Sequence, residues 1–280
     1  MVKIASGSVI VIVGAGAFGV STAYSLIKER PSAHVILIDE AREQGASFDP
    51  SKVVRADYGD KLYMKIALEA LDLWRSDPLF RPFYHETGLV WVDSDDSLQR
   101  ITENYQHFGA KKAYELMDSK DLKALPRIYQ DANFTGVNKV FINHNGGWVE
   151  AADALKSVLQ SAVDYGVEYR EATVEAVLFD DEGNCVGVKT SLGETLNATH
   201  VVLAAGAAIP KLLADSAPER EEMQVGDRLR AAAICEATVQ LSPEQAEDFH
   251  GGPVFVHEVA PTQGSYEHLC FDIWFSAFIY

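Results

Sequence analysis

A glycine-rich turn near the start of the chain constrains the fold more than any other feature of the sequence. Residues 8–13 are a continuous apolar run rich in β-branched side chains, which is typical of a strand buried on both faces. Residues 14–19, GAGAFG, follow directly, and a helical pattern continues over residues 18–30 up to a proline. A second apolar run, residues 34–38, ends at Asp39. This order predicts a strand–helix–strand unit in which the glycine turn opens the helix.

The spacing of the glycines matches the fingerprint of a dinucleotide-binding unit. Gly14 allows a tight turn, Gly16 leaves room for a pyrophosphate, and Gly19 lets the helix pack closely against the strand. The N-terminus of the helix presents free N–H groups and a partial positive charge to the phosphates. Asp39 is placed to accept hydrogen bonds from a ribose 2′-hydroxyl, and its charge disfavours a 2′-phosphate. The predicted nucleotide-binding residues are Gly14, Gly16, Ala17, Phe18, Gly19 and Asp39.

The chain after Asp39 favours FAD over a nicotinamide cofactor. A nicotinamide-dependent dehydrogenase usually continues with further strand–helix repeats, whereas residues 41–51 form a polar loop, residues 53–54 a short strand and residues 61–75 a helix. Buried strands of the parallel type return only after Gly166, so distant segments build the nucleotide-binding layer. Two alternatives stay open at this point: an NAD-dependent dehydrogenase, and a non-catalytic remnant that binds the nucleotide.

The second half of the chain contains further predicted elements. Residues 151–165 predict a helix that ends at Gly166, where a C-terminal glycine is expected. Apolar runs and turn residues then follow each other closely, which is typical of short strands joined by hairpins. The predicted strands are residues 167–169, 174–179, 186–190 and 199–205, with hairpin-type turns at 180–184 and 191–195 and an antiparallel-type segment at 230–241.

Composition and charge exclude several classes of protein. With 41 acidic against 24 basic residues, the formal net charge is −17, and such a chain repels nucleic acid and anionic lipid. No apolar stretch approaches the length of a membrane span, and the N-terminal apolar run leads into the glycine turn as a core strand does. Three cysteines lie far apart in the sequence, which favours a reducing compartment: Cys185, Cys235 and Cys270. The eight histidines lack the spacing of metal ligands, so we expect no metal site.

Four segments in a characteristic order carry a resemblance to a known family. The chain resembles the FAD-dependent amino acid oxidase superfamily, and within it monomeric sarcosine oxidase, fungal fructosyl amino acid oxidases and saccharopine or pipecolate oxidases. Family members continue well past residue 280, so the resemblance also implies a chain truncated at its C-terminus. The segments are residues 9–26, 51–75, 146–169 and 199–213, supported by the strand-like residues 83–92.

The resemblance implies catalytic roles for two basic residues. Family members place a basic residue beside the flavin ring, and Lys52 occupies that place in this sequence. An arginine three residues later pairs with the substrate carboxylate, and Arg55 occupies that place. The alternative is that both are solvated charges that flank a short strand.

The resemblance also implies further contacts to the cofactor. Ser47 and Ser51 fall in the loop that lies against the cofactor, and the backbone of Val174 corresponds to a contact with adenine. Ala205 and Gly206 end a strand that runs past the FAD, where a small residue is needed for close approach. Val174 and Gly206 are equally consistent with packing and turn roles.

The fold that the resemblance implies is α/β, with a three-layer, Rossmann-like FAD-binding domain and an interleaved α+β substrate domain built on an antiparallel sheet. The implied activity is oxidation of the C–N bond of a secondary or N-substituted amino acid to an imine, with O2 reduced to H2O2. The expected partners are therefore a small amine and O2, for a monomer in the cytoplasm or the peroxisome. The predicted limits are 1–84 and 145–215 for the FAD-binding domain, 85–144 and 216–270 for the substrate domain, and 271–280 for an irregular apolar tail.

Overall fold

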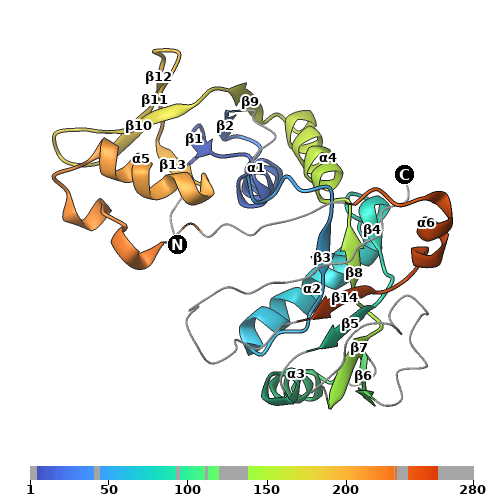
Figure 1. The fold of residues 1–280 in the computed structure, drawn as a ribbon. Helices are drawn as coiled ribbons and strands as arrows, with labels where there is room; N and C mark the ends of the chain where they lie inside the picture. Colours follow the sequence, from blue (N-terminus) through green and yellow to red (C-terminus); the bar gives the residue numbers. More distant parts are fainter. Residues whose placement is uncertain are drawn as a thin grey trace. The chain divides into compact units, whose positions relative to one another are not determined.

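The computed structural model divides into two units, which are described separately (Figure 1). Unit 1 comprises Met1–Pro50 and Ala151–Ala233, and unit 2 comprises Ser51–Glu150 and Ile234–Tyr280. Each unit therefore draws on two separate stretches of the sequence. The structure describes residues 5–40, 45–92, 95–110, 113–119, 138–229, 231 and 239–257.

Unit 1 is organised around a parallel sheet of four strands in the order β13-β1-β2-β9. The helix α1 (Ala17–Glu29) joins β1 to β2, as the strand–helix–strand prediction requires. Parallel strands need such crossover connections, and the returning strands β9 and β13 come from the second stretch of the unit. The strands are β1 (Val9–Val13), β2 (His34–Asp39), β9 (Glu168–Glu171) and β13 (His200–Leu203).

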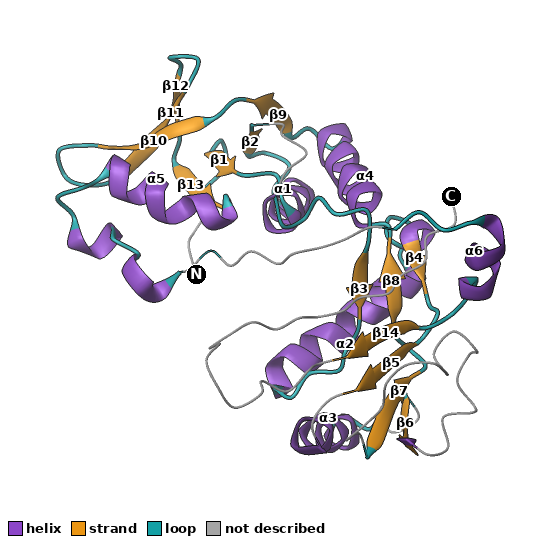
Figure 2. Ribbon diagram, viewed as in Figure 1, coloured by secondary structure: helices purple, strands orange, loops and turns teal. Residues whose placement is uncertain are grey.

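Unit 1 has three layers. Successive side chains of the parallel sheet point to its two opposite faces, and each face packs against another layer. On one face, apolar side chains of β1 and β2 pack against a second, antiparallel sheet, β10-β11-β12, and against α5. On the other face lie α1 and α4, which contact each other (Figure 2). The elements introduced here are α4 (Ala151–Asp164), β10 (Val174–Phe179), β11 (Cys185–Thr190), β12 (Thr195–Asn197) and α5 (Ile209–Ser216), with short 3-10 helices at Gly206–Ala208, Glu221–Met223 and Gly226–Arg228.

The part of unit 2 that the structure describes forms two sheets, in the orders β14-β5-β7-β6 and β3-β8-β4. All pairings are antiparallel except that of β14 with β5, which is parallel. The described residues of the unit also form the helices α2, α3 and α6. The bounds are β3 (Lys52–Val54), α2 (Lys61–Ser76), a 3-10 helix at Arg81–Phe83, β4 (Tyr84–His85), β5 (Leu89–Val92), α3 (Asp95–His107), β6 (Tyr114–Asp118), β7 (Lys139–Asn143), β8 (Gly147–Val149), α6 (Pro243–Phe249) and β14 (Val254–His257).

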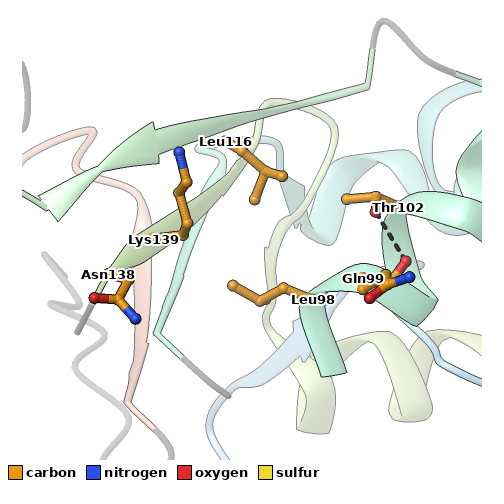
Figure 3. A pocket seen from close by; sticks show the side chains of 6 residues that line it. All are labelled: Leu98, Gln99, Thr102, Leu116, Asn138 and Lys139. Carbon is orange, nitrogen blue, oxygen red and sulfur yellow. Dashed lines mark hydrogen bonds between the residues drawn. The ribbon is translucent and has the colours of Figure 1, made fainter. Parts of the chain in front are cut away.

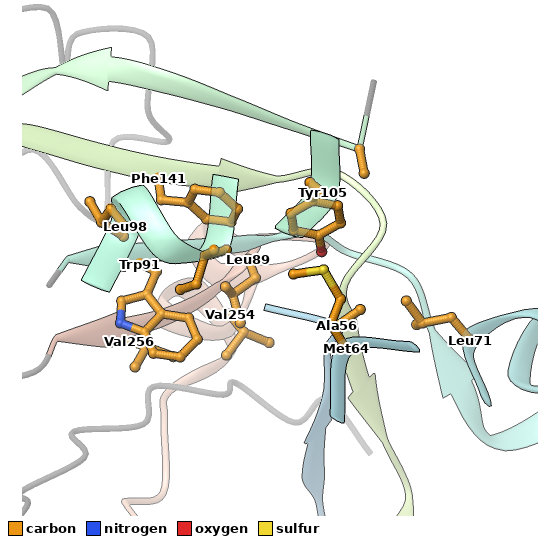
Figure 4. Close-up of a cluster of buried hydrophobic side chains, with 12 residues drawn as sticks. Ala56, Met64, Leu71, Leu89, Trp91, Leu98, Tyr105, Phe141, Val254 and Val256 are labelled. Carbon is orange, nitrogen blue, oxygen red and sulfur yellow. The ribbon is translucent and has the colours of Figure 1, made fainter. Parts of the chain in front are cut away.

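The core of unit 2 joins side chains from α2, α3 and the larger sheet (Figure 4). Met64 and Leu71 of α2 are buried in this core, as are Leu89 of β5, Tyr105 of α3 and Phe141 of β7. Burial of such apolar side chains is the main contribution to the stability of the folded unit. The core thereby fixes the end of β3 and the beginning of α2. The predicted substrate-binding arginine lies in the segment between these two elements.

The structure and its similarity to known folds confirm the predicted fold class. Predicted helices 18–30 and 151–165 correspond to α1 and α4 within one residue at each end. The helix α3 and the strands β6 and β7 were not predicted, and most of the antiparallel-type segment 230–241 lies outside the described residues.

The division into units places residues 51–84 and 145–150 in unit 2 and residues 216–233 in unit 1. It therefore cuts the chain at other positions than the predicted domain limits. Those limits concern which parts bind the cofactor and the substrate, and they stay a prediction.

Candidate functional site

The glycine turn of unit 1 is held by main-chain groups at the ends of three parallel strands. Gly14 is buried with φ at +101°, a conformation that L side chains rarely adopt, and its N–H donates to the carbonyl of Ile38 at 2.7 Å. A Cβ on Gly14 would lie 2.6 Å from the carbonyl oxygen of Ala204, whose own N–H donates to Val13 at 2.7 Å. The turn therefore lies where β1, β2 and β13 end, at one edge of the sheet.

The other two glycines bring α1 close to the turn and leave its N-terminus open. A Cβ on Gly19 would lie 1.7 Å from the carbonyl oxygen of Gly14, so only glycine permits this approach. Gly16 is the N-cap of α1 and has no side chain that could cap the helix, and the first turn contains no acidic residue. Ala17 and Phe18 are exposed, and the N–H of Ala17 donates to Ser47 Oγ at 3.0 Å. Main-chain N–H groups of this kind bind anions.

Asp39 lies beside this turn at the end of β2. Its Oδ2 accepts a hydrogen bond from the Ala15 N–H at 2.7 Å, and its carbonyl accepts from Ala172 at 2.8 Å. Ala172 leads into Val174, the first residue of β10, which is half-buried against the apolar layer of the unit. The acidic side chain thus lies next to the turn, and the adenine-contact candidate follows two residues after the contact of Ala172 with Asp39.

Ala205 and Gly206 follow β13 at the same edge of the sheet, and Gly206 adopts φ of +51°. The structure therefore brings together the predicted cofactor residues of unit 1. A glycine cradle that a Cβ would narrow, a helix N-terminus with glycine at its N-cap and an adjacent carboxylate fit the pyrophosphate and ribose of a dinucleotide. Ser51 and Lys52 belong to unit 2, where Lys52 is exposed in β3 and pairs in register with Val149 of β8.

Arg55 lies in unit 2 in a segment that we call the Arg55 loop, residues 55–59, between β3 and α2. Its guanidinium carbon lies 4.1 Å from the ring centroid of Trp91 and 4.5 Å from that of Tyr58. Cation–π contacts of this kind restrict the guanidinium to one plane. Within the described residues its one hydrogen bond goes to the carbonyl of Asp57, which leaves other N–H groups for a ligand.

Sequence reasoning missed three buried polar residues under this loop. Asp57, Tyr105 and Asn143 are each at most 1% exposed, and we call them the polar cluster. The Tyr105 hydroxyl and the Asn143 amide both donate to Asp57 Oδ1 at 2.8 Å. Burial raises the pKa of the Asp57 carboxyl, while the hydrogen bonds and the charge of Arg55 lower it. Nothing in the sequence marks these residues, because they are distant from one another along the chain.

A separate cavity of about 300 Å³ lies in unit 2 between α3 and the sheet (Figure 3). Two leucines and four polar side chains line it, and none of its residues was predicted to belong to a site. Within the described ranges, no group of His, Cys, Asp and Glu side chains could hold a metal ion. No helix among the described residues is long and apolar enough to cross a lipid bilayer. The cavity is lined by Leu98, Gln99, Thr102, Leu116, Asn138 and Lys139.

Comparison with known proteins places the chain in a family. Residues 10–262 match the family described as FAD dependent oxidoreductase. The chain belongs to this family. It is 29% identical over 265 residues to L-saccharopine oxidase of Schizosaccharomyces pombe, a match that covers 88% of the chain and 59% of that protein. The peroxisomal sarcosine oxidase of Homo sapiens is 23% identical over 202 residues, covering 70% of the chain and 50% of that protein.

The fold is also that of a solved relative. A crystal structure of a thermally stable mutant of fructosyl peptide oxidase superposes with a TM-score of 0.72 and 26% identity, covering 91% of this chain and 60% of that one. The chain therefore spans 50% to 60% of the length of these relatives. The predicted family and the predicted cofactor, FAD, are confirmed, and the NAD-dependent alternative is wrong. The roles of the individual site residues stay predictions.

Proposed function

We propose that the protein oxidises the C–N bond of a secondary or N-substituted amino acid to an imine, with O2 as electron acceptor and H2O2 as product. The relatives named as oxidases of saccharopine, sarcosine and fructosyl peptides support this substrate class. The observation that carries the proposal is Arg55, whose guanidinium is flanked by two aromatic rings and keeps free donors. Such a group is preorganised to bind a carboxylate.

FAD, when bound, supplies the chemistry by accepting a hydride equivalent from the amine and passing electrons to O2. In this proposal the open N-terminus of α1 and Gly16 bind the pyrophosphate, and Asp39 binds the adenosine ribose. Ser47, which accepts from the Ala17 N–H, fixes the entrance to that N-terminus. Ala205 and the neighbouring Gly206 line the approach at the same edge of the sheet, and the backbone of Val174 in β10 contacts the adenine.

Arg55 binds and orients the substrate in this proposal. Its planar fork presents two parallel N–H groups to a carboxylate, which fixes both the position and the direction of the amino acid. Holding a reacting C–H bond in a fixed orientation removes much of the entropic barrier of the reaction. The aromatic rings of Tyr58 and Trp91 keep this fork from turning.

Lys52 stabilises negative charge on O2 as electrons reach it. A fixed positive charge about 4 Å from a developing negative charge contributes on the order of 4 kcal/mol at an effective dielectric near 20. Lys52 is exposed on β3, three residues before Arg55, so both basic residues come from one short segment. Ser51 precedes it in that segment.

The proposal is tested by expressing the chain and recording its visible spectrum before and after acid precipitation. Retained absorbance near 450 nm shows bound flavin, and its partition on precipitation shows whether the flavin is covalent. Peroxide release is then measured with sarcosine, saccharopine, pipecolate and a fructosyl amino acid. A folded, colourless protein that does not take up added FAD contradicts the proposal. Bound FAD without peroxide from any of these amines supports the alternative of a non-catalytic remnant.

The role of Lys52 has its own test, the substitution Lys52→Met. We expect flavin reoxidation by O2 to slow far more than flavin reduction by the amine, because the lost charge acts on oxygen alone. Stopped-flow absorbance measures the two half-reactions separately. Lys65→Met, on the exposed surface of α2, is a matched control that should change neither rate. Equal slowing of both half-reactions in Lys52→Met contradicts this role.

Location and assembly also belong to this proposal. We propose a monomer in the cytoplasm or the peroxisome, and a relative named as peroxisomal supports the second location. The strong negative charge of the chain supports a small-molecule enzyme that binds neither nucleic acid nor anionic membrane.

A further inference from the structure

The Arg55 loop rests on a buried polar cluster that the proposed chemistry does not use. Asp57 accepts from the Tyr105 hydroxyl at 2.8 Å, and its two oxygens accept from Asn143 Nδ2 at 2.8 and 3.0 Å. Tyr105 comes from α3 and Asn143 from β7, so the cluster joins three segments of unit 2. Buried polar groups that are hydrogen-bonded in this way define one arrangement of the chain.

The main chain of the Arg55 loop is fixed by the same helix. Asn104, the neighbour of Tyr105 in α3, donates from Nδ2 to the carbonyls of Tyr58 and Gly59, each at 3.0 Å. Asn143 Oδ1 in turn accepts from the Asn145 N–H at 2.7 Å, so the amide is held at both ends. The loop is thus attached to α3 and β7 through side chain and backbone together.

These attachments determine where the guanidinium of Arg55 lies. Tyr58, one of its two aromatic neighbours, belongs to the anchored loop, and Trp91, the other, lies in the sheet that contains β7. Arg55 also donates to the carbonyl of Asp57 itself. A shift of Asp57 therefore moves the ring of Tyr58 and the carbonyl that accepts from Arg55. Both then change position relative to the ring of Trp91.

Stability alone does not account for a carboxyl group at this place. A buried carboxyl bonded to neutral donors costs desolvation free energy, and apolar residues of similar volume are often as stable or more so. A group that is costly to bury but fully hydrogen-bonded is more consistent with a demand for orientation than with packing.

We infer that the polar cluster of Asp57, Tyr105 and Asn143 positions Arg55 for the substrate carboxylate, with Asp57 as the positioning residue that links the loop to α3 and β7. This inference rests on the proposed function for the identity of the ligand. The orientation of the guanidinium itself does not depend on that function, and it can be measured without turnover.

The first experiment measures Arg55 directly by NMR. In protein labelled with 15N at arginine, the Nε–H signal of Arg55 is identified by its loss in Arg55→Lys. The guanidinium carbon lies over two rings, so we expect the Nε–H signal to be displaced to low frequency by ring currents. In Asp57→Asn and in Tyr105→Phe this signal should move toward the position of exposed arginines. In Thr102→Val, a buried polar-to-apolar change in α3 outside the cluster, it should not move.

The second experiment measures kcat and KM for two substrates. One is the amine that gives the fastest peroxide release in the assay above, and the other is its carboxamide. We expect Asp57→Asn to raise KM for the carboxylate form about tenfold to a hundredfold, with a smaller change in kcat, because misplaced binding groups lose affinity first. KM for the carboxamide should not change. The absence of peroxide with every amine contradicts the proposed function and leaves the NMR result to decide the positioning role.

An Arg55 signal that is unchanged in both cluster variants overturns the inference. So does an equal rise in KM for carboxylate and carboxamide, because that pattern indicates general damage to the site. If Asp57→Asn does not fold, Tyr105→Phe decides, since it keeps the ring and removes only the hydroxyl that donates to Asp57.

Discussion

The glycine turn of unit 1 and the Arg55 loop of unit 2 place functional groups in different ways. In unit 1 the positions are set by main-chain contacts, such as the 2.7 Å hydrogen bond from Gly14 to Ile38 and the close approach of Gly19 to the turn. In unit 2 they are set by side chains, because the loop is anchored through Asp57 to Tyr105 and Asn143.

This difference indicates how each region responds to substitution. Where the backbone itself makes the contact, an added side-chain atom clashes with it, and the substitution impairs folding. Where a buried side chain makes the contact, a substitution of the same shape preserves the fold and changes the orientation of the group it supports. Substitutions in the two regions should therefore differ in what they damage.

Gly19→Ala should damage folding most severely. The added Cβ would lie 1.7 Å from the carbonyl oxygen of Gly14, and neither backbone can move without breaking the strand–helix contact. We expect a loss of more than about 3 kcal/mol of unfolding free energy, at the upper end for overpacking. Chemical denaturation measures it. Gly59→Ala, whose Cβ would meet Arg100 at an ordinary 3.5 Å, is the control and should retain stability. Wild-type stability in Gly19→Ala refutes this packing.

Arg55→Lys should leave the fold intact and weaken catalysis. Lysine keeps the charge but loses the planar fork between Tyr58 and Trp91. Charge-assisted hydrogen bonds contribute about 1.5–3 kcal/mol, so we expect kcat/KM to fall about tenfold to a hundredfold. Steady-state peroxide assays measure this, and thermal unfolding checks the fold. An unchanged kcat/KM means that the carboxylate binds elsewhere.

Gly16→Ala should affect the cofactor and spare the fold. Its Cβ would lie 3.2 Å from Ser47 Oγ, a side chain that is able to give way by a few tenths of an ångström. The methyl group nevertheless occupies the approach to the helix N-terminus, so we expect FAD affinity to fall about tenfold, or about 1.4 kcal/mol. Titration of the apoprotein with FAD, followed by protein fluorescence, measures it. Undiminished affinity would show that the pyrophosphate does not approach Gly16.

The smallest effect should be a pH dependence of stability that arises from Asp57. Burial raises the pKa of its carboxyl, so the folded protein binds this proton more tightly than the unfolded chain does. Its contribution to stability is therefore complete below the ordinary pKa of 3.8 and is lost as pH rises through the raised value. The unfolding free energy of the wild type minus that of Asp57→Asn should fall over this range, as urea denaturation at successive pH values measures. A difference that rises with pH contradicts the raised pKa.

The sequence allowed much of unit 1 to be predicted, because its signals are local. Each glycine of residues 14–19 serves a need of the backbone within a few residues, and Asp39 follows at the spacing that the motif requires. The helix α3 was also within reach, since Leu98, Ile101 and Tyr105 recur at helical spacing, but the polar residues between them obscured it.

The polar cluster could not have been predicted in the same way. Asp57 is 48 residues from Tyr105 and 86 residues from Asn143, and each alone is an ordinary residue of a loop, a helix or a strand. Only the tertiary fold brings them together, and a polar side chain gives no periodic signal of its burial. The orientation of Arg55 between two rings was hidden for the same reason.

The parallel pairing of β14 with β5 has a consequence for synthesis of the protein. Val254 pairs with Leu89, so this contact spans more than half of the chain and closes late. Until residues 254–257 leave the ribosome, β5, whose four residues are all buried in the finished unit, keeps one hydrogen-bonding edge open. An apolar open edge is a template for unwanted strand pairing, so β5 is exposed to aggregation during this interval.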